Sequence, residues 1–105
     1  MPGVQKMKTK SNLARVLDSG QFAVTAEISA PQNTEFNTVR KNINCIKGYV
    51  DAFNVPDGQA AVVAMASWAV CLVGIEEGLD AIVHMTCRDQ NRIALQMDIL
   101  AVSAF

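Results

Sequence analysis

The sequence predicts a small α/β domain with parallel strands, and two observations lead to this fold class. Strand-like and helix-like segments alternate along the chain, and the strand-like segments begin near residues 22, 49 and 80. Repeats of roughly thirty residues with a helix between successive strands are βαβ units, whose strands pair in parallel. The chain has 105 residues, half of them hydrophobic and 18% charged, so it forms at most one domain and is not disordered.

Capping residues and alternation define the first elements. Ser11 is expected to cap a short helix that ends at Gly20. Residues 22–29, FAVTAEIS, alternate as a strand does, and Ala30-Pro31 ends that strand. Thr34 is the expected cap of the next helix, and Gly48 ends that helix. Its apolar residues have helical spacing: Phe36, Val39, Ile43 and Ile46.

The second half repeats this unit twice. Residues 49–55 form the second predicted strand, and the Pro-Asp-Gly turn at 56–58 ends it. An alanine-rich helix follows to about Ile75, and residues 80–86 form the third strand. Asp89 is the expected cap of a last helix with an apolar stripe: Ile93, Met97, Leu100 and Ala104.

Charge and cysteine content exclude several classes of protein. The net charge is −1, and the lysines that cluster at the start lie on a terminal tail, so no nucleic-acid partner is expected. The uncharged segment 58–75 has no basic flank, which favours a buried helix over a membrane span. There are three cysteines, an odd number, and none has C-x-x-C spacing. Free thiols and a cytoplasmic location are therefore expected.

Strand alternation favours a partial (α/β)8 TIM barrel over a doubly wound sheet. In a barrel, large apolar residues face the helices: Phe22, Val24, Ala26 and Ile28, then Phe53 and Val55, then Val83 and Met85. The alternate residues point into the barrel, and those nearest the strand ends are Glu27, Asn54, His84 and Thr86. Barrel active sites lie at that end. A complete doubly wound domain stays open as the alternative, because barrels usually need about 250 residues.

His84, Cys87 and Glu27 each have a chemical and a plain structural interpretation. No third ligand accompanies His84 and Cys87, so no metal site is expected. Alternation also separates their side chains, which weakens a nucleophile–base pair, and the alternative is a core histidine beside a small hydrophobic thiol. A partly desolvated Glu27 would suit proton donation, whereas the plain interpretation is a solvated glutamate at a strand end.

Motifs in all the predicted strand regions resemble one enzyme family. FAVTAEISAP, AFNVPDG and HMTCRDQNRIALQMDILA, in this order, resemble the N-terminal part of methylenetetrahydrofolate reductases over about residues 21 to 101. The resemblance implies a flavin-binding (α/β)8 barrel. It also implies reduction of 5,10-methylenetetrahydrofolate to 5-methyltetrahydrofolate, with FAD as the hydride carrier and a reduced nicotinamide or another electron donor.

The resemblance also assigns roles to residues. Glu27 matches the family's acid, which protonates N10 of the folate and opens its five-membered ring to an iminium that flavin N5 reduces. His84 and Thr86 match positions that line the flavin site, and Asn54 and Pro56 match the end of the second strand. Many relatives have a threonine in place of Pro56, so that hydroxyl contact is missing from this chain.

The expected organisation is a tail with a short helix at 1–20, then three βα units of an incomplete flavin-binding barrel at 21–105. Such a piece leaves open sheet edges. We therefore expect a fragment that is inactive alone and that self-associates or pairs with a complementing chain. The alternative is a non-catalytic α/β module that oligomerises or docks a partner. Neither a membrane nor nucleic acid is an expected partner.

Overall fold

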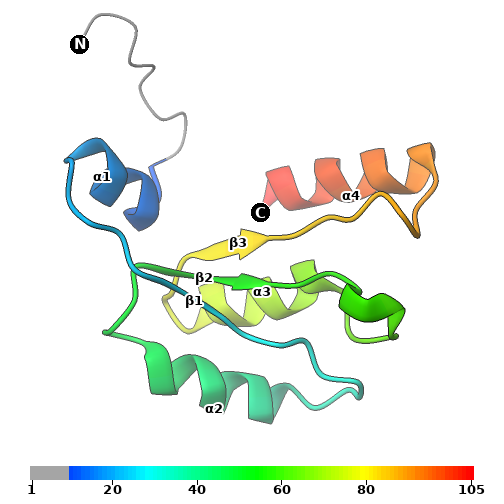
Figure 1. Cartoon of the computed structure of the whole chain (residues 1–105), viewed down its shortest axis with the longest axis horizontal. Helices are drawn as coiled ribbons and strands as arrows, with labels where there is room; N and C mark the ends of the chain where they lie inside the picture. Colours follow the sequence, from blue (N-terminus) through cyan, green and yellow to red (C-terminus); the bar gives the residue numbers. More distant parts are fainter. Residues whose placement is uncertain (1–9) are drawn as a thin grey trace, which may run out of the picture.

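The protein contains a three-stranded parallel sheet with the strand order β1-β2-β3. The computed structural model describes residues 10–105, so most of the predicted tail lies outside the described residues. The strands are β1 (Thr25–Glu27), β2 (Ala52–Val55) and β3 (Ala81–Val83), and β2 pairs with both neighbours in parallel (Figure 1). The predicted α/β class and its parallel strands are confirmed.

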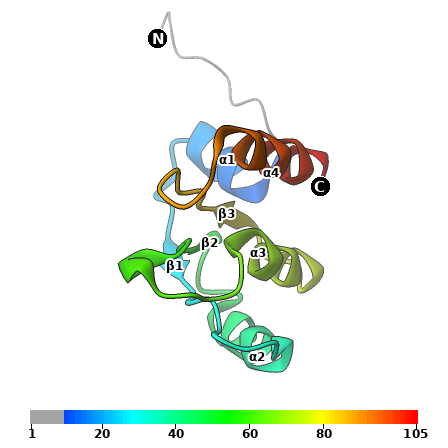
Figure 2. The same ribbon diagram turned by 90° about the vertical axis from the view of Figure 1, so that its right-hand side faces the viewer.

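Two helices cover one face of this sheet. They are α2 (Phe36–Ile46) and α3 (Ser67–Glu76), and both lie on the same side of the strands (Figure 2). Phe53 and Val55 of β2 are fully buried, as their predicted direction toward the helices requires. The core between sheet and helices consists of apolar residues from both layers: Ile28, Val39, Ile43, Phe53, Val55, Val70, Cys71, Val73 and Leu79.

A glycine sets the distance between α3 and β2. A Cβ atom placed on Gly74 would lie 2.1 Å from two ring atoms of Phe53. Phe53 has no exposed surface, so its ring has no free space to move into. Only glycine therefore allows the helix to approach the sheet this closely.

The first helix, α1 (Asn12–Asp18), lies at the amino-terminal ends of the strands (Figure 1). Ser11 caps it as predicted, because its hydroxyl accepts a hydrogen bond from the Ala14 amide at 3.1 Å. The Leu13 amide donates to the Asp80 carboxylate at 3.0 Å, and the Asn12 side chain donates to the Asp51 carbonyl at 3.3 Å. These bonds fix α1 to the residues that precede β2 and β3.

The strands are shorter than the alternation predicts. Residues 22–24 precede the paired part of β1, and Phe22 is 91% exposed although it was expected to face the helices. Tyr49, predicted at the start of the second strand, is 82% exposed. Phe22 and Tyr49 lie outside the stretch in which β2 pairs with its neighbours, so their side chains stay open to solvent.

The starts of α2 and α3 also differ from the predictions. Thr34 does not cap α2; the Asn33 side chain accepts a bond from the Glu35 amide at 2.9 Å, and the helix begins after Glu35. This local turn competes with the predicted cap. The alanine-rich segment is not one helix from residue 59, because Gln59–Ala61 form a 3₁₀ turn and α3 starts only at Ser67.

The last helix, α4 (Arg92–Ala104), lies beyond β3 on the side away from α2 (Figure 1 and Figure 2). Its cap is Asn91, whose side chain accepts from the Ala94 amide at 2.8 Å, and not the predicted Asp89. The Asp89 carboxylate is held instead by Arg88 at 2.8 Å. No residue of α4 is buried, and much of its predicted stripe is well exposed, including Ile93, Met97 and Leu100.

Among residues 10–105, no helix is long and apolar enough to cross a membrane.

Candidate functional site

Glu27 and Asn54 lie side by side at the carboxyl ends of β1 and β2. The two residues are partners in the parallel ladder, and the Asn54 amide donates to Glu27 Oε2 at 3.3 Å. Glu27 is exposed and Asn54 is half-buried. Of the two interpretations of Glu27, the structure therefore agrees with the solvated glutamate at a strand end. The reason is that β1 is an edge strand of the described sheet, so its end is open to solvent.

His84 and Thr86 follow β3 at the same end of the sheet. His84 is exposed and Thr86 is half-buried. The alternative in which His84 is a core histidine is thus wrong. Cys87 is also exposed, so it is not a buried hydrophobic thiol. In the described part of the chain, no group of three or more His, Cys, Asp and Glu side chains is placed to hold a metal ion.

A carboxylate links the connection after β2 to the segment after β3. Asp57 Oδ2 accepts hydrogen bonds from the Thr86 amide at 2.9 Å and from the Thr86 hydroxyl at 3.5 Å. The Arg88 guanidinium, two residues after Thr86, donates to the carbonyl of Gly58, the residue after Asp57, at 2.6 Å. The same guanidinium lowers the pKa of the Asp89 carboxyl, to which it is hydrogen-bonded. The turn at 56–58 is therefore tied to residues 86–88.

A buried hydroxyl makes a second link between these segments. Ser67, the first residue of α3, is 2% exposed. Its hydroxyl donates to the Val55 carbonyl at 2.8 Å and accepts from the His84 amide at 3.2 Å. In the sequence, Ser67 is one residue of the alanine-rich segment, and no motif distinguishes it. Asp57 belongs to the turn at 56–58, and its residue type is explained by the turn alone. Both are functional candidates that sequence reasoning missed.

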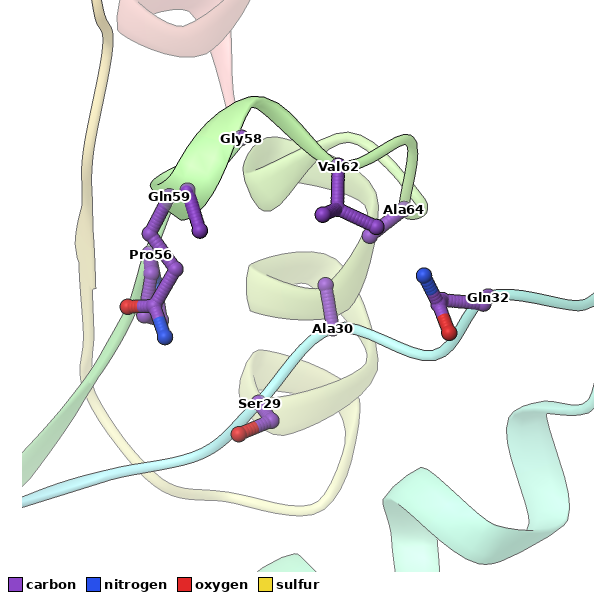
Figure 3. Close-up of a pocket in the computed structure, with 9 residues that line it drawn as sticks. Ser29, Ala30, Gln32, Pro56, Gly58, Gln59, Val62 and Ala64 are labelled. Carbon is purple, nitrogen blue, oxygen red and sulfur yellow. The ribbon is translucent and has the colours of Figure 1, made fainter.

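An open cavity of about 240 Å³ lies beside this edge (Figure 3). Two segments line it, the chain leaving β1 and the loop leaving β2: Ser29, Ala30, Gln32, Pro56, Gly58, Gln59, Ala60, Val62 and Ala64. Pro56 is the predicted site residue in this lining. Glu27 lines a different open cavity, with Ile28, Ser29 and residues of α2. The predicted residues share one end of the sheet but not one enclosed cavity.

The structure is that of an α/β protein with carboxylate, amide, imidazole and hydroxyl groups at the carboxyl ends of its parallel strands. In α/β proteins of this kind, ligands commonly bind at that edge of the sheet. The family model of methylenetetrahydrofolate reductase matches residues 12–104, and the chain belongs to this family. The match extends the resemblance to α1 and to the end of α4. Neither the curated proteins nor the solved structures gave a match to the chain.

Proposed function

We propose that the chain supplies the first three βα units of a flavin-dependent reductase that converts 5,10-methylenetetrahydrofolate to 5-methyltetrahydrofolate. The observation that carries this proposal is the family match over residues 12–104, within which Glu27 and Asn54 pair at the carboxyl edge of the sheet. The remaining strands of an (α/β)8 barrel would come from outside residues 1–105. The position of α2 and α3 on one face of the sheet supports a barrel, because a doubly wound sheet has helices on both faces.

The residues present fit one wall of a flavin site. Amide, imidazole and hydroxyl groups from Asn54, His84 and Thr86 offer hydrogen-bond donors and acceptors at one edge, and Pro56 lines the adjoining cavity. The cavity volume of about 240 Å³ is below the roughly 300–1,000 Å³ typical of sites that enclose a whole ligand. FAD would therefore need further walls from the rest of the barrel.

Glu27 is the proposed acid. The Asn54 amide fixes its carboxyl group through Oε2 and leaves Oε1 for the substrate. From that position Glu27 donates a proton to N10 of the folate, which breaks the bond between N10 and the methylene carbon. A bound flavin would supply the hydride that this carbon accepts, and a reduced nicotinamide or another donor would supply the electrons. A cytoplasmic location is part of the same proposal.

The test is Glu27→Gln in the assembly isolated under native conditions from the organism that makes the chain. We expect this assembly to be yellow with flavin and to reduce methylenetetrahydrofolate, whereas the isolated chain is inactive. Glu27→Gln should abolish turnover and leave the flavin absorption in place, because the amide keeps the shape but has no acidic proton. Glu35→Gln is the matched control, since Glu35 is exposed and its side chain makes no capping bond. Full turnover by the Glu27→Gln assembly would refute the role of Glu27.

A second candidate function is a non-catalytic module that oligomerises or docks a partner. The outward apolar stripe of α4 favours it, because that stripe has no cover among the described residues. A colourless native assembly without reductase activity would select this candidate over the first.

A further inference from the structure

We propose that Ser67 and Asp57 are positioning residues that hold the backbone of His84 and Thr86 against the end of β2. This inference rests on the proposed function, since it concerns the wall that His84 and Thr86 would give to a flavin site. It also makes a claim about the chain without any ligand, and that claim can be tested separately.

Regular pairing between β2 and β3 ends too early to hold these residues. The last partners in the ladder are Val55 and Val83. After Val55 the chain leaves the ladder through the turn at residues 56–58, and the Val55 carbonyl accepts from the Ser67 hydroxyl. Amides two residues apart on a strand point to the same neighbour, so both the His84 and Thr86 amides need acceptors on the β2 side.

Side-chain oxygens accept from these two amides in place of backbone carbonyls of β2. The Ser67 hydroxyl accepts from the His84 amide at 3.2 Å, and the Asp57 carboxylate accepts from the Thr86 amide at 2.9 Å. Two alternate amides are therefore paired with two side chains, one from the first residue of α3 and one from the turn after β2. Hydrogen bonding on this side of the chain therefore continues past Val83, at residues 84 and 86, although β2 itself has ended.

The two acceptors are themselves held in place. The Ser67 hydroxyl donates to the Val55 carbonyl at 2.8 Å, and its residue is buried at the start of α3. The turn that carries Asp57 is fixed by the bond from Arg88 to the Gly58 carbonyl. A charged acceptor makes a stronger bond to an amide than a neutral one does, so Asp57 can hold Thr86 even in its half-buried position.

This arrangement decides where two side chains point. Because successive side chains of an extended segment alternate between faces, a backbone held in strand-like register from residue 82 to 86 sends residues 82, 84 and 86 to one face. Asn54 is the ladder partner of Ile82, so this is the face that carries Asn54 and Glu27. Loss of either acceptor would release His84 or Thr86 from that face.

Amide hydrogen exchange of the unliganded chain tests the positioning directly. We expect Ser67→Ala to speed exchange of the His84 amide, and Asp57→Ala that of the Thr86 amide, each by about tenfold or more, as loss of a hydrogen bond does in a local opening equilibrium. The Phe53 amide, bonded to the Asp80 carbonyl inside the sheet, should keep its rate. Asp57→Asn should restore most of the protection of Thr86, because its side-chain oxygen still accepts.

Matched controls are Ser103→Ala and Asp18→Ala, which make the same changes at exposed positions. Folded Ser67→Ala and Asp57→Ala chains whose His84 and Thr86 amides exchange at the rates of these controls would overturn the proposal. If Ser67→Ala does not fold, exchange of the Thr86 amide in Asp57→Ala decides whether the proposal holds, because Asp57 is less buried than Ser67. His84 is the only histidine, so its imidazole resonances give a second signal without assignment of the whole spectrum.

FAD titration of the native assembly tests the link to the cofactor. Both alanine variants should bind FAD at least about tenfold more weakly than their controls, the loss typical of residues that orient a ligand-binding group. Equal FAD affinity in variants with faster amide exchange would overturn the link to the cofactor. An assembly whose unmutated form binds no FAD would refute the proposed function, and the exchange rates would still decide whether Ser67 and Asp57 hold His84 and Thr86.

Discussion

At the scale of single residues, the environment of a side chain decides its role more than its chemical type does. Ser67 and Ser103 are both helix serines, yet one bridges two backbone groups in the core and the other is exposed. Asp57 and Asp89 flank the same edge, but Asp57 accepts from Thr86 whereas Asp89 pairs with its neighbour Arg88. Of these four residues, only Ser67 and Asp57 link segments that are distant in sequence.

Gly74→Ala should destabilise the protein by about 2 kcal/mol or more, the upper part of the range for an overpacked core. Alanine improves helix propensity by about 1 kcal/mol over glycine, but here its Cβ would lie 2.1 Å from the buried Phe53 ring. Denaturant unfolding measures the change. In the double variant, Phe53→Leu should recover part of the stability that Gly74→Ala removes. Additive effects of the two substitutions on the free energy of unfolding would contradict a direct clash.

The three thiols should react at different rates. Burial raises the pKa of the Cys71 thiol, although the Ser67 hydroxyl partly offsets this. Since the thiolate is the reactive form, Cys71 should be labelled last at about pH 8, after the exposed Cys45 and Cys87, and its labelling should speed up as the pH rises. Mass spectrometry of the labelled chain gives the order. Unfolded protein, in which all three react alike, is the control; early labelling of Cys71 in the folded chain would contradict its burial.

At the scale of elements, hydrogen bonds at the ends set the boundaries. α1 and α4 begin where Ser11 and Asn91 accept from the amides of Ala14 and Ala94. β3 ends where β2 turns away. The sheet and the helices that cover it meet around Phe53, and the contact between α3 and the Phe53 ring depends on Gly74.

Asn91→Ala should loosen the start of α4 and cost about 1 kcal/mol of helix stability, because the Ala94 amide loses its acceptor. Amide exchange at Ala94 and Leu95 reports the change. Asp89→Ala is the control, since the Asp89 carboxylate bonds to Arg88 and not to the helix. If Asp89→Ala loosened α4 more than Asn91→Ala, the assignment of the cap would be wrong.

At the scale of the whole molecule, packing is uneven. The layer of α2 and α3 on the sheet holds the core, whereas α4 has no buried residue. The outer edges of β1 and β3 have no strand partner within residues 10–105. Open edges and an outward apolar stripe both favour association with another polypeptide.

The chain should therefore self-associate in a concentration-dependent way when it is purified alone. Met97 and Leu100, 63% and 72% exposed, lie on the α4 stripe. Met97→Glu with Leu100→Glu should shift the sedimentation profile toward the monomer, because a charge on the contact surface loses hydration on association. Gln96→Glu is a control on the same helix at an exposed polar position. A wild-type chain that is monomeric at all concentrations would rule out this surface as a contact between copies.

The sequence predicted some features because they depend on neighbours in the chain. Alternation in residues 22–29 placed a strand there, although only Thr25–Glu27 pair. The predicted direction of Phe53 and Val55 was right because a two-residue period fixes which face a side chain takes. The positions of caps were less certain, since Asn33, Thr34, Asp89 and Asn91 all suit a cap and only the competing bonds decide among them.

By itself, the sequence determined the α/β class, the parallel order of three strands and the polar residues at their carboxyl ends, all of which follow from local periodicity and spacing. The tertiary structure alone decided that Ser67 and Asp57 hold the segment after β3, that Glu27 is exposed, and that the α4 stripe faces outward. The physical reason is that these features depend on partners far apart in the chain: Thr86 is 29 residues from Asp57.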